Sequence, residues 1–175
     1  MLGVQIPPWV PFANTGKTPY KYKMPPVTLL DYPLDRERLL VSAENARKNS
    51  KSYSDYRTSI PMENWVIAPY TDSYIEQIQH DLGVSGKPRF YFAAPNFTVP
   101  THIDNGTLCA VNFVISDQAS PVTYGNQNYL YTQAVLNTTQ PHSVMNGPVE
   151  RILFKISIFD ESYESLVARI PYKKS

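Results

Sequence analysis

The sequence predicts a mainly β protein, a β-sandwich or jelly roll with two helices near its N-terminus. After Gly86 the chain consists of short apolar or alternating runs separated by turn residues, which is typical of strands. Aromatic residues make up 13% of a chain that also contains 16 prolines, a combination that favours short strands joined by turns. Asn-Gly or Gly-Asn pairs break the runs at 105–106, 125–126 and 146–147.

The length of 175 residues predicts a single domain, 1–175, with three parts. Residues 1–33 contain seven prolines, so we expect an extended arm lying over the domain, anchored by Trp9 and Phe12. Residues 34–86 should form a helical support, and residues 87–170 the β core.

Helical spacing and capping residues predict two helices in the support. The first, Asp35–Asn49, has Asp35 as its cap and an apolar face that begins at Leu39. The second, Asp72–Leu82, should end at Gly83, and Trp65–Ile67 reads as a short strand between them. Seven core strands are expected, with an eighth at Leu166–Ile170: Arg89–Ala94, Thr98–Asp104, Leu108–Ser116, Pro121–Tyr124, Tyr129–Leu136, His142–Met145 and Arg151–Phe159.

Composition argues against several classes of function. Sixteen basic and fifteen acidic residues give a formal charge of +1, so no long-range field gathers nucleic acid or anionic lipid. The sequence has no apolar run that could span a bilayer and no signal peptide, and its single cysteine, Cys109, should be a buried thiol on a strand. We therefore expect a soluble, cytoplasmic protein without membrane or nucleic-acid partners.

Two of the three histidines suggest a metal site. His102 and Asp104 are two residues apart on an expected strand, so both side chains should face the same side. An imidazole and a carboxylate on one face supply two of the three ligands of a two-histidine, one-carboxylate triad for non-haem iron. On the second helix His80 lies opposite the apolar stripe, which indicates a solvated surface residue, so His142 remains as the third ligand.

His142 opens one expected strand, and Arg151 opens the next one, nine residues later. The series His-Ile-Asp, a distal histidine and then this arginine resembles the 2-oxoglutarate and Fe(II) dependent oxygenases over about residues 87–160. That resemblance implies a double-stranded β-helix in which His102, Asp104 and His142 bind iron. It also implies that Arg151 binds the far carboxylate of 2-oxoglutarate, which is oxidised to succinate and CO₂ during turnover.

The sequence departs from that family at Leu153, which stands where an Arg-x-Ser pattern has its serine. Lys155 lies four residues after Arg151 on the same expected strand, so both side chains should face the same side, and Lys155 is the alternative anchor. The alternative for Arg151 itself is an exposed arginine paired with Glu150 or Glu161.

Tyr91 and Asn112 are weaker candidates to hydrogen-bond the cosubstrate or substrate. A two-residue hairpin at Asn105-Gly106 would leave Asn112 outside the metal face. In the oxygenase fold the chain crosses to the opposite sheet after the His-x-Asp motif, so the same pair would form a corner. We favour the corner.

Two other functions remain open on sequence grounds: a cupin-type metal enzyme with different chemistry, and a non-enzymatic β-sandwich that binds a partner through its tyrosines. For an oxygenase, near-zero charge and many tyrosines favour a small amino-acid-like molecule or a peptidyl side chain as substrate. Hydroxylation is expected because it is the commonest reaction of the family that the chain resembles.

Overall fold

The structure is a computed structural model that describes residues 23–49 and 64–170. The expected anchors Trp9 and Phe12, with most of the proline-rich arm, lie outside the described residues.

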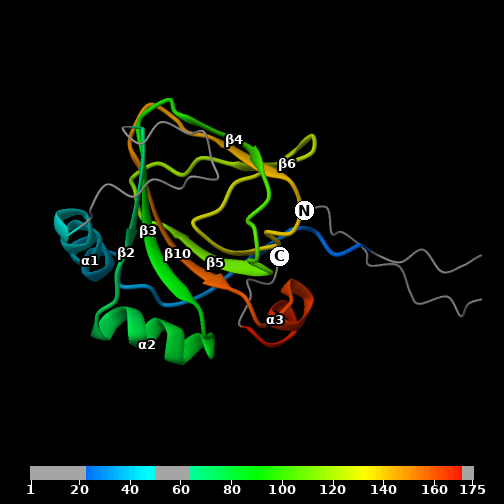
Figure 1. The fold of residues 1–175 in the computed structure, drawn as a ribbon, viewed down its shortest axis with the longest axis horizontal. Coiled ribbons are helices and arrows are strands. Elements are labelled where there is room, and N and C mark those ends of the chain that lie inside the picture. The colour runs from blue at the N-terminus through cyan, green and yellow to red at the C-terminus, as the bar shows by residue number, and fades with distance from the viewer. Residues whose placement is uncertain (1–22, 50–63, 171–175) are drawn as a thin grey trace, which may run out of the picture.

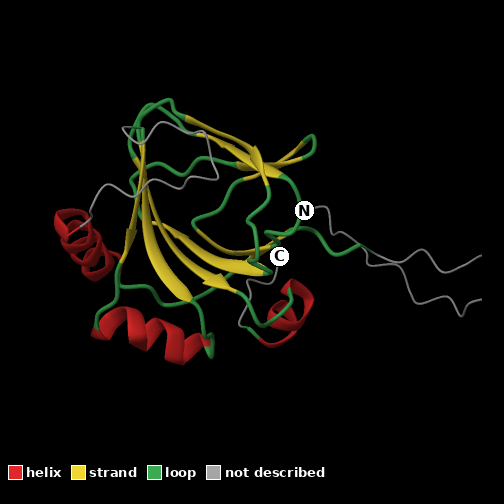
Figure 2. Cartoon of the chain, viewed as in Figure 1, coloured by secondary structure: helices red, strands yellow, loops and turns green. Residues whose placement is uncertain are grey.

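The described strands form two antiparallel sheets that face each other (Figures 1 and 2). In order across it, the major sheet contains β1 (Val27–Leu29), β8 (Gln133–Leu136), β5 (Cys109–Val114), β10 (Arg151–Ile158), β3 (Lys87–Ala93) and β2 (Trp65–Pro69). The minor sheet contains β4 (Thr98–His102), β9 (His142–Met145), β6 (Val122–Tyr124) and β7 (Gln127–Tyr129).

The order of strand pairing identifies the fold. The chain reverses direction at the β6–β7 hairpin. The strands before the hairpin then pair in turn with the strands after it: β5 with β8, β4 with β9 and β3 with β10. Successive pairs alternate between the minor and the major sheet, so one long antiparallel ribbon winds around the space between them. This is a double-stranded β-helix of the jelly-roll type, which confirms the predicted fold class. Strands β1 and β2, from segments assigned to the arm and the helical support, extend the major sheet at its two edges.

Both expected helices are present and begin within one residue of the predicted starts. Helix α1 spans Arg36–Asn49, and the Asp35 carboxylate accepts a hydrogen bond from the Arg38 amide. Helix α2 spans Ser73–Leu82, is capped by Asp72 and ends at Gly83, whose φ of 60° is the left-handed conformation that glycine favours. His80 is exposed on α2, as predicted. No helix among the described residues is long and apolar enough to cross a membrane.

The two faces of the major sheet differ in chemistry because successive side chains of a strand point to opposite sides. On the outer face Phe90, Phe113 and Phe154 are fully buried and belong to the core that includes α1 and α2; Figure 1 shows these helices lying outside that sheet. Cys109 is buried in the same core, as predicted. The inner face carries polar residues and faces the minor sheet.

Two strand predictions were wrong. Residues 166–169 belong to a helix, α3 (Tyr163–Arg169), and Ile170 is its C-cap, so this segment is not a strand. The Ser162 hydroxyl caps the helix, and buried Tyr163, Leu166 and Ile170 follow helical spacing. The run Tyr129–Leu136 is not one strand, because it contains the end of β7 and the whole of β8, which lie in different sheets.

The Asn105-Gly106 pair forms the predicted corner. Strand β4 belongs to the minor sheet and β5 to the major sheet, so the chain changes sheets between them. Gly106 has a φ of 77°, which a residue without a Cβ adopts at little cost. Asn112 consequently points inward.

A second corner, between β9 and β10, is stabilised by the side chain of Asn146. Its amide nitrogen donates to the main-chain oxygens of Ala93, Ala94 and Val149, and its carbonyl accepts from the Ser120 hydroxyl. Asn146 is buried, so each of these bonds replaces one that water would make in the unfolded chain.

Replacing Asn146 by aspartate should therefore destabilise the protein strongly. Asn146→Asp keeps the shape but places a carboxylate against three carbonyl oxygens, and we expect a loss of about 3 kcal/mol or more in the free energy of unfolding. Urea denaturation measures it. Asn128→Asp on the exposed β6–β7 hairpin is the matched control, with an expected change below about 0.5 kcal/mol. Equal effects of the two substitutions would contradict the proposed role of Asn146.

Candidate metal centre

A cavity of about 550 Å³ lies between the two sheets. Its lining includes the three predicted metal ligands, His102, Asp104 and His142, and the predicted anchor Arg151. The candidate site residues from three separate strands and one corner therefore share one space, which is where ligand sites of barrel-like β folds are found.

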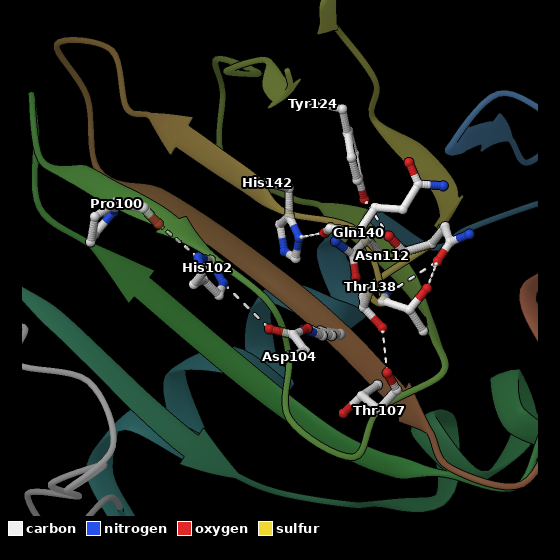
Figure 3. A network of polar contacts seen from close by, with 12 residues as sticks. Pro100, His102, Asp104, Thr107, Asn112, Tyr124, Thr138, Gln140 and His142 are labelled. Atoms are coloured by element: carbon white, nitrogen blue, oxygen red, sulfur yellow. Dashed lines mark hydrogen bonds and ion pairs between the residues drawn. The ribbon is translucent and has the colours of Figure 1, made fainter.

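The pairing of β4 with β9 places His102 directly opposite His142. The two ring centroids are 4.5 Å apart. Figure 3 shows both imidazoles directed toward the same region as the Asp104 carboxylate. Strand register, rather than proximity along the chain, brings the two histidines together.

A β-bulge adjusts the direction of His102. Val99 pairs with Val144 and His102 pairs with His142, so β4 has one residue more than β9 between these pairs. In a regular strand two residues three apart would face opposite sides, yet Val99 and His102 both line the cavity. Pro100 lies in the bulge, where the absence of an amide hydrogen is harmless.

Main-chain carbonyls orient both imidazoles. The Nδ1 atom of His102 is 2.8 Å from the Pro100 oxygen, and Nδ1 of His142 is 2.9 Å from the Gln140 oxygen (Figure 3). A carbonyl oxygen only accepts, so each Nδ1 must carry the hydrogen, and when neutral each ring presents the lone pair of Nε2 as its ligand atom. The Tyr124 ring stacks on His142 with centroids 5.4 Å apart and further restricts it.

Asp104 follows β4 and is held through its backbone. Its amide donates to the Thr138 oxygen at 3.2 Å, and its carbonyl accepts from the Thr107 amide at 3.2 Å. The carboxylate Oδ1 atom lies 3.3 Å from Nε2 of His102. The ligand atoms of His102, Asp104 and His142 all lie within 4.8 Å of one another, close enough to hold one metal ion.

Lys155 on β10 forms an ion pair with Oδ2 of Asp104 across the cavity. Burial alone would raise the pKa of Asp104, but the Lys155 ammonium and the hydrogen bonds to the carboxylate hold it well below its ordinary range. Burial likewise disfavours the charged form of Lys155, yet Asp104 keeps the pKa of the ammonium above its ordinary value. Lys155 therefore contacts the predicted ligand set, and the choice between Arg151 and Lys155 as the anchor remains a prediction.

The pKa values of the two histidines shift in opposite directions. Burial lowers the pKa of His142 below its ordinary value of 6.5, so this ring is neutral at neutral pH. Burial acts in the same direction on His102, but its hydrogen bonds to Asp104 and to the Pro100 carbonyl outweigh burial and raise the pKa. A metal ion that binds at Nε2 of His102 thus competes with a proton.

The donor set suits a divalent transition metal. Two imidazoles and one carboxylate are the ligands of the facial triad, which binds Fe(II) and leaves other coordination positions open. The three side chains predicted as ligands are thus brought together, and their use as ligands remains a prediction.

Arg151 lies on the inner face of β10 and is 4% exposed. Its guanidinium donates to the Ser120 oxygen at 2.8 Å and to the Tyr131 hydroxyl at 3.0 Å. The alternative of an exposed surface pair is wrong, because Glu150 pairs with Arg47 and Glu161 with Arg169. No carboxylate of the described residues pairs with Arg151, so a buried cation faces the cavity without a counter-charge.

Asn112 and Tyr91, the weaker candidates, also line the cavity. The amide nitrogen of Asn112 donates to the Tyr131 hydroxyl at 3.0 Å, while its oxygen is buried without a hydrogen-bond partner in the described structure. An orphaned buried acceptor is rare in a folded protein and indicates a missing donor such as water or a ligand. Tyr91 packs against Trp65 with ring centroids 5.8 Å apart.

Tyr131, which joins Asn112 to Arg151, was not predicted. It lies in the crossing between β7 and β8, inside the run that sequence analysis treated as one strand. Its hydroxyl accepts both hydrogen bonds, so its own hydrogen is directed elsewhere. Among thirteen tyrosines no local pattern distinguishes this one.

Comparisons with known proteins give only remote similarities. No protein-family model matches the chain, and no curated protein matches it in sequence. Solved structures with a similar fold include an RmlC-like cupin protein from Desulfovibrio desulfuricans (14% identity, 62% of this chain and 97% of that one, TM-score 0.39). They also include an oxidoreductase of the 2OG-Fe(II) oxygenase family from Burkholderia pseudomallei (10% identity, 70% of this chain and 81% of that one, TM-score 0.45). A third is ectoine synthase from P. lautus (8% identity, 69% of this chain and 86% of that one, TM-score 0.42). Similarities of this size assign no family or activity to the chain.

The Asp104–Lys155 pair makes a prediction about the metal-free protein. Asp104→Asn leaves the Lys155 ammonium buried without a counter-charge, and we expect the free energy of unfolding to fall by about 3 kcal/mol. The double variant Asp104→Asn/Lys155→Met should recover most of that loss, because it removes both charges. Urea denaturation of the chelator-treated wild type, of Asp104→Asn, of Lys155→Met and of the double variant measures these changes.

The exposed pair Arg36–Asp117 provides the control, since Asp117→Asn should change stability by less than about 0.5 kcal/mol. Additive effects at 104 and 155 would contradict an ion pair in the folded protein.

The same pair predicts sensitivity to acid. Because the folded-state pKa of Asp104 lies below its ordinary value of 3.8, its stabilisation is complete well above that value and is lost as pH falls toward the lowered one. Between pH 6 and pH 3 the wild type should therefore lose more stability than the double variant. Parallel curves of stability against pH would show that the pair contributes nothing.

Proposed function

We propose that this protein is an Fe(II) and 2-oxoglutarate dependent oxygenase that hydroxylates a small molecule or a peptidyl side chain. The observation that supports it most is the combination of two features in one cavity: the His102, Asp104 and His142 cluster, and the buried Arg151, which has no carboxylate partner in the described part of the chain. A metal-binding triad alone fits many enzymes. An uncompensated buried cation in the same cavity favours a metal-binding cosubstrate that carries a second, distant carboxylate.

Arg151 would bind the far carboxylate of 2-oxoglutarate. The guanidinium has five N–H groups, and the bonds to the Ser120 oxygen and the Tyr131 hydroxyl use two of them. Those bonds orient the planar fork, so that its free edge can make charge-assisted hydrogen bonds to a carboxylate. The Tyr131 hydroxyl hydrogen is a further donor. It takes the place of the serine that the Arg-x-Ser pattern supplies and that Leu153 replaces here.

Asp104 and Lys155 would set the geometry at the metal. The ammonium engages Oδ2, which leaves Oδ1, the atom nearer to His102, as the ligand atom. Bound together, iron and 2-oxoglutarate supply the oxidation of a substrate C–H bond by dioxygen. The protein's part is to hold the ligand atoms in place and to line the cavity with Val99, Val144 and Leu153, which limit water.

The direct test is anaerobic titration of the protein with Fe(II) and 2-oxoglutarate. The chelate of the two should produce a charge-transfer absorption, and His142→Ala should abolish it by removing one of the three ligands. Folded protein that binds Fe(II) but gives no such band with 2-oxoglutarate would refute the oxygenase and leave a cupin-type metal enzyme of other chemistry.

Arg151 variants make the proposal quantitative. Arg151→Met should raise the dissociation constant of 2-oxoglutarate in this titration at least tenfold, because two charge-assisted hydrogen bonds are lost. Fe(II) affinity without 2-oxoglutarate should be unchanged. The dissociation constant of 2-oxoglutarate for Arg151→Lys should lie between those of the wild type and Arg151→Met, because lysine keeps the charge but lacks the planar guanidinium fork.

Arg36→Met, on the surface, is the matched control and should leave both affinities as in the wild type. Unaltered 2-oxoglutarate binding in Arg151→Met would place the anchor elsewhere.

A further inference from the structure

The cavity lining is strongly cationic, although the whole chain has a formal charge of only +1. Among the described residues that line it, Lys87, Arg89, Arg151 and Lys155 are basic, and Asp104 is the single acidic residue. The excess positive charge is therefore local to the cavity. Arg151 and the Asp104–Lys155 pair are accounted for above, which leaves Lys87 and Arg89 on β3.

Arg89 has a cationic neighbour and no anionic partner among residues 23–49 and 64–170. In the β3–β10 ladder it lies directly opposite Lys155, and both side chains are on the cavity face. Like charges directly opposite in an antiparallel pair repel and destabilise the sheet. Asp104 balances Lys155, but Arg89 has neither an ion pair nor a hydrogen bond with any described residue, although it is half-buried.

The neighbours of Arg89 extend the same cationic region, away from Arg151. Lys87 lies two residues earlier on the same face, opposite Ser157, with its ammonium 5.2 Å from the ring centroid of Phe159. Arg151 lies opposite Ala93, four residues further along β3, or roughly 13 Å at the rise of a strand. Arg89 is the ladder partner of Lys155, and Lys155 in turn contacts Asp104 of the candidate metal centre.

The surroundings of this region are partly apolar. Tyr91 follows Arg89 on the cavity face of β3 and packs against Trp65, which lies opposite Ala93 toward the Arg151 end, and Phe159 lines the cavity beside Lys87. A ligand with one anionic group and an apolar or aromatic body would satisfy both features.

We propose that Arg89 and Lys87 form a second anion-binding subsite, which binds a carboxylate or phosphate group of the substrate. The substrate is then a small organic acid, held by its anionic group beside the metal centre while 2-oxoglutarate occupies the Arg151 end. Its assignment to the substrate rests on the proposed oxygenase function, whereas the anion subsite itself does not.

The subsite can be tested on chelator-treated protein without 2-oxoglutarate. The probes are 3-phenylpropionate, phenyl phosphate and neutral 3-phenylpropionamide, which share an aromatic body and differ in charge. Binding is followed by calorimetry, with tryptophan fluorescence as a second signal because Trp65 lines the cavity. At least one acid should bind at least tenfold more tightly than the amide, and the tighter acid identifies the anionic group as carboxylate or phosphate.

Arg89→Gln should reduce the affinity for that acid about tenfold and leave the amide unaffected, and Lys87→Gln should have a smaller effect in the same direction. Arg36→Gln, on the surface, is the matched control and should change the affinity less than twofold, whereas Arg151→Gln tests whether the acid binds at the other end of the cavity instead. Equal binding of acid and amide, or loss of acid binding in Arg151→Gln rather than in Arg89→Gln, would overturn the proposal. Thermal unfolding of each variant establishes that it is folded.

This result is independent of the iron and 2-oxoglutarate titration, because neither component is present. If the chelate band fails to appear while the Arg89-dependent difference is found, the oxygenase is refuted and the anion subsite stands. If the chelate band appears while acid binding does not depend on Arg89, the oxygenase proposal is retained and the subsite is overturned.

Discussion

The antiparallel register between β4 and β9 is the constraint on which the candidate site depends. It places His102 opposite His142 although forty residues separate them in sequence. Asp104 follows two residues later, where the chain leaves the minor sheet. Because the side chains of a strand alternate, a slip of one residue would turn one of the histidines away from the cavity. The bulge at Pro100 and Thr101 absorbs the extra residue of β4 that would otherwise cause such a mismatch.

The winding of the ribbon explains how a small protein maintains a polar cavity. The outer face of the major sheet is covered by α1 and α2 and carries the phenylalanine core, so stability does not require apolar residues on the inner face. That face can then hold Lys155 and Arg151, both buried. Asp104 compensates the first charge, and the main-chain oxygen of Ser120 with the Tyr131 hydroxyl partly satisfies the second. The positive charge that remains in the cavity would attract an anionic ligand.

Much of this arrangement could be predicted from local patterns. Two-residue alternation predicted that His102 and Asp104 share a face, and helix phase excluded His80. These two inferences depend on neighbours along the chain, where periodicity is informative. The corner that puts Asn112 inside was inferred from the resemblance to the oxygenase fold, because an Asn-Gly pair alone favours a hairpin.

The features that were missed depend on long-range pairing. The contact of Lys155 with Asp104 and the position of Arg89 opposite Lys155 follow from which strands are neighbours, and no short motif encodes that. The position of Tyr131 was not predicted, because the chain changes sheets between Tyr129 and Gln133 without a glycine or proline to mark the change. The last segment was assigned to a strand because it is a short, mostly apolar run, whereas the Ser162 cap and the buried stripe of α3 specify a helix.

The most direct test of the account is X-ray absorption at the metal edge of protein loaded anaerobically with Fe(II). The arrangement of His102, Asp104 and His142 predicts one ion per chain, with two imidazole nitrogens and oxygen donors in its coordination shell. Adding 2-oxoglutarate should replace water ligands while both imidazoles remain. Folded protein that retains no ion, or an ion whose shell contains no imidazole nitrogen, would contradict the central claim that strand register assembles a metal centre here.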